Sequence, residues 1–283
     1  MRFLKNFLFS SKKKKTYHLL SSKSEIDTLK NELCKSDILG IDTEFDWRRT
    51  YFPNLSILQI STRKKIFLID YLNFSNLDFL EQILLKKDFL IFHSVRSDTT
   101  ILSKCLQIEV DQVFDIQIAE RFLTGGNNQN YAAIVENYFP VKLSKSETNS
   151  DWLQRPLSKK QISYAANDVR FLIDIFEKQK KKLISMNKYN DVLNASKKEA
   201  NLGNQDLHVS RLAKLSNAKE KEKKLFMWRE NLAIKRNIPS SYIFKDKHLK
   251  EILKVYKSSD GLNKVTNLTR SRTLAKDIIE NLN

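Results

Sequence analysis

DILGIDTEF, residues 37–45, is an apolar run that leads directly into two carboxylates. Residues 37–42 have the pattern of a buried strand. Side chains two positions apart on a strand project from the same face, so Asp42 and Glu44 lie side by side. Two adjacent carboxylates repel each other unless a cation lies between them. The pair therefore indicates a metal site or, as the plainer interpretation, a solvated turn at the end of a strand.

The flanking sequence predicts further strands on both sides of this one. They are TYHLLSS at 16–22, SILQIST at 56–62, KIFLID at 65–70 and DFLIFHS at 88–94. Helical spacing of apolar residues is found at 24–36 and 76–86, and it dominates the chain from Ser97 onward. Strands first and helices after, with one β-α-β crossing, are typical of an α/β domain with a mixed sheet.

The composition changes where the α/β pattern ends. Residues 177–208 are rich in Lys, Asn, Ser and Glu, and a new helical pattern at 225–239 stops at Pro239. We therefore predict a basic N-terminal arm at 1–15, an α/β domain at 16–182, a linker at 183–207 and a small all-α domain at 208–283. The aromatic residues predicted for the core of the last domain are Phe226, Trp228, Tyr242 and Phe244.

The charge balance indicates a polyanionic partner. The chain has 50 Lys and Arg against 33 Asp and Glu, which gives a net charge of +17. Residues 208–283 hold 18 of the basic and 8 of the acidic residues, so they carry +10 of that excess. Such a field attracts nucleic acid, because phosphate contacts release counterions. An anionic membrane surface, or a charge that serves only solubility, would also account for the composition.

The cysteines and the N-terminus indicate a protein of the reducing cytoplasm. Cys34 and Cys105 show no CxxC or Cys/His spacing, so neither a disulfide framework nor a zinc site is predicted, and both thiols are expected in the core. MRFLKNFLFSSKKKK lacks the long apolar region and the cleavage site of a signal peptide. No apolar run reaches the roughly 18 residues of a membrane span. We therefore expect a cytoplasmic location and no membrane partner.

Three more side chains follow the first acidic pair in a fixed order. Asp98 comes after the strand at 88–94, in the first turn of a helix, where it would also complement the helix dipole. Tyr164 and Asp168 lie four residues apart in a helix that Ser158 could cap, so they share one helical face. Each feature is common by itself, and only the ordered series is specific.

The ordered series resembles the DEDD exonuclease superfamily, in its tyrosine-containing branch. The stretches similar to ribonuclease D are IDTEF (41–45), SILQIS (56–61), HSVRSD (93–98), VFDIQIAERFL (113–123), KSETNSDWLQRPLS (145–158) and YAANDVRFL (164–172). This resemblance covers residues 16–180 and implies a ribonuclease H-like 3′-5′ exonuclease domain. Residues 223–253 resemble one helicase-and-ribonuclease-D C-terminal (HRDC) domain, a small helical module that binds nucleic acid.

The resemblance implies two divalent metal ions, Mg²⁺ or Mn²⁺, held by Asp42, Glu44, Asp98 and Asp168. Asp42 bridges both ions, and Asp98 supports one of them. Glu44 and Asp168 help to hold the ion that activates water. Tyr164 orients the attacking water, since an ordinary tyrosine pKa of about 10 makes it a poor base at neutral pH. Hard oxygen ligands without a Cys or His cluster suit these metals, and the implied reaction is two-metal-ion hydrolysis.

Three further residues of the similar stretches are expected close to the carboxylates. Gln59 and His93 either contact the terminal nucleotide or are ordinary strand residues with satisfied hydrogen bonds. Asp115 is interpreted as a helix cap or a supporting group, and not as a ligand.

The stretch at 145–158 supplies candidates for a single-strand channel. Lys145, Trp152 and Arg155 would offer phosphate pairing and aromatic stacking, which suit a single-stranded substrate. The alternative for Trp152 is packing under Pro156.

The predicted function is a 3′→5′ exoribonuclease that releases 5′-mononucleotides and trims precursor tRNA and other structured RNAs. RNA is the expected partner, and no obligate protein partner is indicated. A DNA 3′-5′ exonuclease of the same superfamily is the first alternative, although the 145–158 stretch favours the RNA enzyme. A non-catalytic RNA-binding protein with a decayed nuclease fold is disfavoured, because all four carboxylates and Tyr164 are present.

Overall fold

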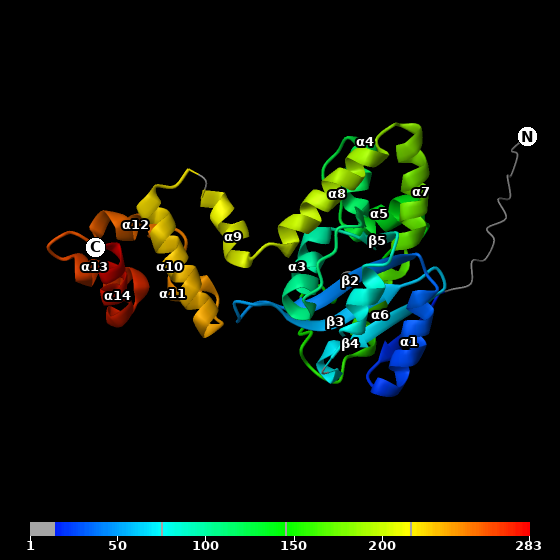
Figure 1. Cartoon of the computed structure of the whole chain (residues 1–283), viewed down its shortest axis with the longest axis horizontal. Coiled ribbons are helices and arrows are strands. Elements are labelled where there is room, and N and C mark those ends of the chain that lie inside the picture. Colours follow the sequence, from blue (N-terminus) through cyan, green and yellow to red (C-terminus); the bar gives the residue numbers. More distant parts are fainter. Residues whose placement is uncertain (1–14, 75, 145, 216) are drawn as a thin grey trace, which may run out of the picture.

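The computed structural model describes residues 15–283 except 75, 145 and 216. It consists of an α/β domain and a helical domain that follow one another along the long axis of the molecule (Figure 1). The predicted basic arm falls outside the described residues except for Lys15. The strands are β1 (Thr16–Leu20), β2 (Ile38–Asp46), β3 (Asn54–Ser61), β4 (Lys65–Asp70), β5 (Phe89–Phe92) and β6 (Val113–Asp115).

The helices divide between the two domains. Those of the α/β domain are α1 (Ile26–Cys34), α2 (Phe79–Leu84), α3 (Val95–Leu106), α4 (Ile116–Thr124), α5 (Tyr131–Tyr138), α6 (Lys159–Arg170), α7 (Leu172–Ser185) and α8 (Tyr189–Asn204). Those that follow are α9 (Leu207–Leu212), α10 (Glu220–Arg236), α11 (Ser240–Ile243), α12 (His248–Val255), α13 (Gly261–Thr269) and α14 (Arg272–Leu282). Short 3₁₀ turns occur at Lys23–Glu25, Tyr71–Asn73 and Ala213–Leu215.

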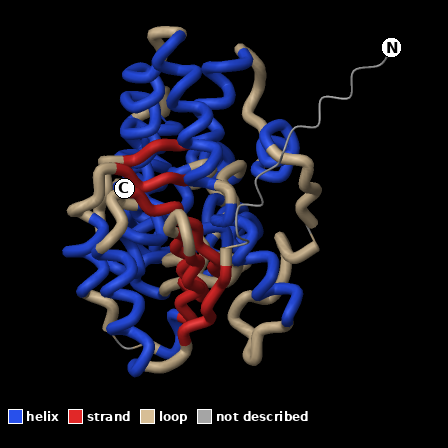
Figure 2. The backbone as a smooth tube through the Cα atoms, turned by 90° about the vertical axis from the view of Figure 1, so that its right-hand side faces the viewer, coloured by secondary structure: helices blue, strands red, loops and turns tan. Residues whose placement is uncertain are grey.

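The described strands form one mixed sheet in the order β1-β4-β3-β2-β5-β6. β3 is antiparallel to its neighbours β2 and β4, whereas β1 runs parallel to β4, β5 to β2 and β6 to β5. Figure 2 shows the strands (red) with helices on both sides. The predicted α/β fold with a mixed sheet is therefore confirmed. β6 was not predicted, because three residues are too few to establish an apolar pattern.

Both faces of the sheet are buried, because alternate residues of its central strands enter different cores. On β3, Leu58 joins a core with α1, α2 and α3, whereas Ile57 joins a second core with α4 to α7. On β2, Ile41 belongs to the first core. Asp42 and Glu44 therefore project toward the second side, where α6 lies.

The segment 183–207, predicted as a linker, is mostly the helix α8, so that prediction is wrong. α8 packs against α3 and β6 and buries Val192, Ser196, Ala200 and Gly203. A Cβ at Gly203 would lie 2.0 Å from Thr99 Oγ1, so only glycine permits this approach of the two helices. The prediction failed because the buried side of α8 consists largely of small residues, which do not produce a recognisable apolar periodicity.

The helical domain has a core of its own around α10, α12 and α14. Phe226 and Phe244 are buried in it, as predicted, and Trp228 is partly buried. Tyr242 is 65% exposed, so its assignment to the core is wrong. Its neighbour Ile243 fills the inward position of the short helix α11 instead.

The β2–β3 hairpin extends beyond the sheet and packs into the helical domain (Figure 1). Tyr51 is 1% exposed, and its hydroxyl donates a hydrogen bond of 2.9 Å to Glu230 Oε2. Asn237, the left-handed C-cap of α10, accepts hydrogen bonds from the backbone N–H groups of Tyr51 and Phe52 at 3.1 and 3.2 Å. The Arg211 guanidinium lies over the Tyr51 ring. The strand that carries Asp42 thus also anchors the helical domain.

The two thiols differ from one another in burial. Cys34 is exposed, so the prediction of a core thiol is wrong for this residue. The buried face of α1 is formed by Leu29 and Leu33, and the residue next to Leu33 is turned away from it. Cys105 is partly buried, and its Sγ donates to Pro53 O at 3.3 Å. Among the described helices, none has the length and apolar character needed to cross a membrane.

Candidate active site

β2 presents two carboxylates where it extends beyond its neighbour β5. β5 pairs only with the first three residues of β2, so the following residues have β3 alone beside them. Asp42 and Glu44 project from this part of β2 toward α6. A bulge directly after Glu44 shifts the register of the strand. The next acid, Asp46, therefore leaves the cluster and pairs with Arg48.

α6 contributes the third carboxylate. The helix begins with a capping box, in which Ser158 Oγ accepts from the Gln161 N–H at 3.1 Å and the Gln161 side chain accepts from the Ser158 N–H at 2.9 Å. The predicted cap at Ser158 is thus confirmed. This fixed start places Asp168 opposite β2, and carboxylate oxygens of Asp42, Glu44 and Asp168 lie within 4.8 Å of one another.

Asp98 approaches from the other face of the sheet. It lies in the first turn of α3, after Ser94, which has a left-handed backbone conformation (φ 66°). Thr43 alternates with the two acids on β2 and so faces the opposite side, where its Oγ1 donates to Asp98 Oδ1 at 2.6 Å. Asp98 is not part of the group of three, but it is close enough to Asp42 for the two charges to repel. The site is therefore three convergent carboxylates with a fourth beside Asp42.

The electrostatics of the site favour a bound cation. Burial raises the pKa of all four carboxyl groups, and that of Asp42 reaches about 7. Repulsion from Asp42 raises the pKa of the other three further. No ion pair among the described residues involves any of the four. A divalent cation would offset both effects, and carboxylate oxygens suit Mg²⁺ or Mn²⁺. The residues present therefore fit a divalent metal site.

Tyr164 lies beside the cluster as a neutral hydroxyl. Burial, together with the charge of Asp168, raises the pKa of Tyr164 above its ordinary value. A hydrogen bond from this hydroxyl favours the charged form of Asp168. The hydroxyl oxygen is also 3.2 Å from Thr148 Oγ1, and the ring packs against Trp152 at a centroid distance of 6.0 Å. A hydroxyl held in this way can orient a water molecule but cannot act as a base near neutral pH.

Gln59 and His93 lie near the site with different exposure. Gln59 is opposite Asp42 in the β2–β3 ladder, fully buried, with its Nε2 3.5 Å from Asp42 Oδ2. Its amide nitrogen lies against Asp42 and its Oε1 has no hydrogen-bond partner among the described residues, so a nucleotide contact of Gln59 stays a prediction. His93 is partly exposed, and its Nε2 lies 3.0 Å from Gln129 O while its ring packs edge-on against Tyr131. A substrate contact of His93 stays a prediction.

Two of the three channel candidates hold the 145–158 loop against the sheet. Trp152 is 3% exposed within the second core, so it cannot stack on a base. Arg155 donates to both carboxylate oxygens of Asp70, at 2.8 and 2.6 Å, and to Trp152 O at 2.8 Å. Every guanidinium nitrogen of Arg155 is therefore engaged within the protein. The prediction that Trp152 stacks on a base is wrong, that of a substrate contact of Arg155 stays a prediction, and Lys145 lies outside the described residues.

Asp115 is a helix cap, as predicted. Its carboxylate accepts from two backbone N–H groups at the start of α4, at 2.8 and 3.4 Å. It also accepts from the N–H groups of Ser94 and Val95, at 3.1 and 2.9 Å. One carboxylate thus ties the start of α4 to that of α3, the helix that carries Asp98. The sequence pattern gave no sign of this second contact.

Two family models match the chain. Residues 17–184, more than half of the chain, match the model described as 3′-5′ exonuclease, and residues 221–271 match the HRDC domain. The ribonuclease D of Desulfotalea psychrophila is 29% identical to this chain over 255 residues, which cover 84% of this chain and 67% of that protein.

Solved structures show the same fold. The Escherichia coli RNase D structure, described as an exoribonuclease involved in structured RNA processing, has a TM-score of 0.83 and 22% identity, and covers 94% of this chain and 74% of that one. Brucella melitensis NrnC with bound Mg²⁺ has a TM-score of 0.57 and 21% identity, and covers 73% of this chain and 98% of that one. These likenesses show the fold, and the family model that matches more than half of the chain shows the family: the chain belongs to the 3′-5′ exonuclease family, is similar to ribonuclease D proteins, and matches the HRDC domain in its helical part.

Proposed function

We propose that this protein is a metal-dependent 3′→5′ exoribonuclease that releases 5′-mononucleotides. The observation that supports the proposal most is the convergence of Asp42, Glu44 and Asp168 within 4.8 Å. Their raised pKa values and the lack of a pairing cation among the described residues make this cluster unfavourable unless a metal is held there.

The four carboxylates divide between two ions in this proposal. Asp42, Glu44 and Asp168 would hold one, and Asp42 with Asp98 would hold the other. Asp42 would be the ligand common to both, since it lies close enough to each of the other three groups for their charges to repel. When bound, the ions supply Lewis-acid activation of the scissile phosphate and of the attacking water. Mg²⁺ and Mn²⁺ are the metals that these oxygen ligands suit.

Two hydroxyl groups complete the site. Thr43 holds Asp98 in a single orientation through its 2.6 Å hydrogen bond. Tyr164 keeps its proton, so its hydroxyl donates to or accepts from a water placed between it and the carboxylates. In this proposal Tyr164 contributes by positioning the water and not by removing its proton.

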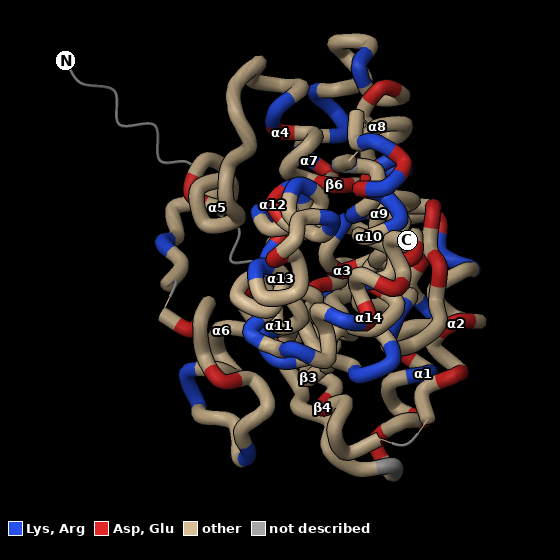
Figure 3. The backbone as a smooth tube through the Cα atoms, turned by 90° about the vertical axis from the view of Figure 1, so that its left-hand side faces the viewer, with Lys and Arg blue, Asp and Glu red and all other residues tan. Residues whose placement is uncertain are grey.

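RNA is the proposed substrate class, and the 3′ ends of precursor tRNA in the cytoplasm are the specific substrate within it. The similar proteins are named ribonuclease D, and that of E. coli is described as acting on structured RNA. The helical domain contributes +10 to the net charge of this chain. Its Lys and Arg residues (blue) gather around α11, α12 and α13 in Figure 3, where they would attract phosphates.

The proposal is tested with RNA and DNA oligonucleotides of matched sequence, labelled at the 5′ end, in Mn²⁺, Mg²⁺ or EDTA. We expect a ladder that shortens from the 3′ end, faster on RNA than on DNA, with nucleoside 5′-monophosphates as products and no cleavage in EDTA. Asp168→Asn is the inactive control. A preference for DNA, internal cuts, or cleavage in EDTA would contradict the proposal.

A further inference from the structure

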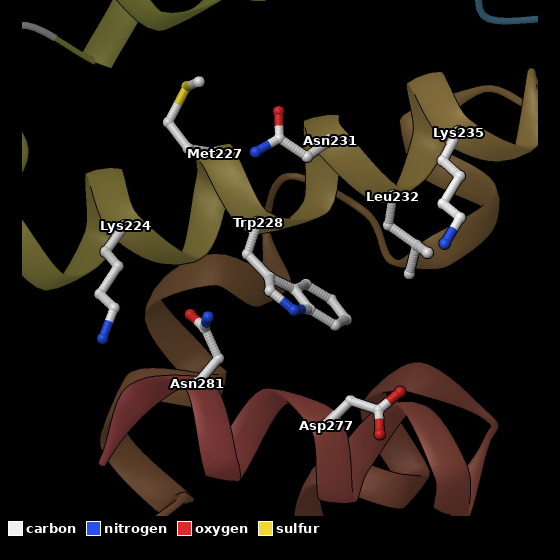
Figure 4. Close-up of a pocket in the computed structure, with 8 residues that line it drawn as sticks. All are labelled: Lys224, Met227, Trp228, Asn231, Leu232, Lys235, Asp277 and Asn281. Carbon is white, nitrogen blue, oxygen red and sulfur yellow. The ribbon is translucent and has the colours of Figure 1, made fainter.

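α10 and α14 of the helical domain enclose a groove of about 520 Å³ around Trp228. The indole projects from α10 toward α14 and lies between Asp277 and Asn281 (Figure 4). It is partly buried, so one part packs on the core of the domain and the rest faces the groove. The rest of the lining comes from α10 and consists of Lys224, Met227, Asn231, Leu232 and Lys235.

The groove residues of α10 lie on one face of the helix. Lys224, Trp228, Asn231 and Lys235 follow one another at intervals of four, three and four residues. The two lysines are therefore about 16 Å apart along the helix axis, with the indole between them. The groove thus combines a flat aromatic surface with a cation on either side.

The polar side chains of the groove have no partners within the part of the chain that the structure describes. Among the described residues, no hydrogen bond or ion pair engages the side chains of Lys224, Asn231, Lys235, Asp277 or Asn281. Oδ1 of Asn281 is buried and still unpaired. This oxygen is closed off from solvent, so the groups of the groove that an outside ligand can reach are the lysines, the indole and the Asp277 carboxylate.

A second and larger hollow of the helical domain differs in this respect. It measures about 730 Å³ and lies against the β2–β3 hairpin. Its central charges are paired, because Arg229 contacts Glu230 and Asp246, and Arg211 contacts Glu230. The charged side chains that line the hollow at the hairpin are thus paired with one another. Those that line the Trp228 groove can pair with an outside ligand.

We propose that the Trp228 groove binds an unpaired segment of single-stranded RNA. One base stacks on the indole, and phosphates farther along the strand, toward the two ends of the groove, pair with Lys224 and Lys235. The Asp277 carboxylate and the Asn281 amide nitrogen lie on α14 beside the indole, where the carboxylate would accept from amino groups of that base and the amide nitrogen would donate (Figure 4).

The charge of the domain supports this occupant over a protein segment. Residues 208–283 carry a net charge of +10, so a polyanion is attracted to the groove and an average protein surface is not. The inference rests on the proposed function, because the RNA in the groove is the strand whose 3′ end the active site shortens. The groove adds a holding site on the same strand, away from the reacting phosphate.

The test uses the full chain in EDTA, so that RNA binds without being cleaved. Fluorescence anisotropy of 5′-labelled single-stranded RNA gives the Kd of the wild type, Trp228→Ala and Trp228→Phe. Tyr242→Ala is the matched control, since Tyr242 is an exposed aromatic residue of the same domain outside the groove. We expect Trp228→Ala to raise the Kd roughly tenfold, and Trp228→Phe and Tyr242→Ala to leave it nearly unchanged.

The lysines are tested by the salt dependence of the same binding. Replacing both Lys224 and Lys235 with Ala should reduce the slope of log K against log salt by roughly 1.4, because two phosphate contacts are lost. Lys254→Ala with Lys264→Ala removes the same charge from α12 and α13, outside the groove, and should reduce the slope less. Equal slopes for the two double variants would overturn the proposal.

A second measurement guards against misfolding of Trp228→Ala. RNA with 5-iodouridine, crosslinked by light to the wild-type chain, should attach to Trp228 itself. Crosslinks confined to other parts of the chain, or an unchanged Kd for Trp228→Ala, would overturn the proposal.

Failure of the groove and failure of the exonuclease can be told apart. Cleavage of a trinucleotide, too short to reach the groove, should proceed at the same rate in Trp228→Ala and wild type. A wild-type chain that binds RNA through Trp228 but cleaves nothing would support the groove and refute the proposed function. Loss of trinucleotide cleavage in Trp228→Ala would overturn the separation of the two sites.

Discussion

In the α/β domain, Asp42, Glu44 and Asp168 crowd their carboxylates within 4.8 Å, whereas in the helical domain two lysines stand apart on either side of Trp228. Neither set has a charge partner among the described residues. Burial and mutual repulsion make the unpaired state of the carboxylates unfavourable, so that site selects a cation strongly. Solvent screens the exposed lysines, so their site binds phosphate weakly and releases it readily. The first arrangement suits chemistry, and the second suits a strand that must move on after each cleavage.

One strand connects the two regions. β2 carries Asp42 near its middle, and the hairpin that follows inserts Tyr51 into the helical domain. Glu230, fully buried, accepts from the Tyr51 hydroxyl and pairs with Arg211 and Arg229. The distance between the two regions is therefore set by packed structure and not by a free linker.

Asp42→Ala should abolish the function of the carboxylate site while leaving RNA binding by the helical domain intact, and this is the largest effect that we expect. Loss of the shared ligand is expected to lower kcat by at least roughly 10³, about 4 kcal/mol of transition-state stabilisation, while the Kd for RNA in EDTA stays the same. Asp46→Ala is the matched control, because Asp46 is on the same strand but pairs with Arg48. Initial rates of mononucleotide release measure the effect. Retained activity in Asp42→Ala would contradict the role of Asp42 as a metal ligand.

Glu230→Ala should break the connection between the regions. It removes the acceptor of the Tyr51 hydroxyl and one of the two carboxylate partners of buried Arg229, so we expect a loss of about 3–5 kcal/mol in the free energy of unfolding. Denaturant titration followed by circular dichroism measures this loss. Lys254→Ala, on the exposed side of α12, should change stability little. A Glu230→Ala protein as stable as the wild type would show that the hairpin does not hold the helical domain.

The stability of the metal-free protein should depend on pH through Asp42. Burial raises the pKa of Asp42 from 3.8 to about 7 in the folded state, so the cost of its charge is absent below about pH 4 and grows as pH rises through about 7. Asp42→Asn has no such charge. In EDTA, the variant should gain stability over the wild type as pH rises, by at most about 4 kcal/mol. Thermal unfolding from acidic to neutral pH checks this, and a constant difference would contradict it.

Tyr164→Phe should have the smallest effect of the four. The hydroxyl orients water without giving up its proton, so its loss is expected to lower kcat roughly 10- to 100-fold. Since burial raises its pKa, the alkaline limb of the pH–rate profile should look alike in Tyr164→Phe and wild type. Thr148→Val, which removes the hydroxyl 3.2 Å from that of Tyr164, should lower kcat less. A loss as large as that of Asp42→Ala would give Tyr164 a more direct role.

Local patterns predicted the elements of the fold that have strong periodicity. β4 was expected at 65–70 and is found there, and the alternation on β2 placed Asp42 and Glu44 on one face. α8 was missed because it buries small residues, and β6 because it is short. In both cases the long-range packing that stabilises the element leaves little trace in its own sequence.

The sequence predicted the carboxylates of the site better than it predicted the residues that pack around them. The order of acids indicated which carboxylates the fold brings together, but Trp152 proved to be buried and Arg155 fully paired, and the pairing of Arg155 depends on Asp70, 85 residues away in the chain. Thr43 is the exception, because its position between two acids on a strand already requires that it face the other side. No local pattern could show that this side holds Asp98.

Binding of Mn²⁺ to the metal-free protein, followed by isothermal titration calorimetry, tests the central claim most directly. The wild type and Asp46→Asn should bind Mn²⁺ with the same affinity and stoichiometry, whereas Asp42→Asn should lose the binding, because the ligand common to both ions is gone. Binding of Mn²⁺ to Asp42→Asn as in the wild type would contradict the assignment of the carboxylate cluster as the metal site.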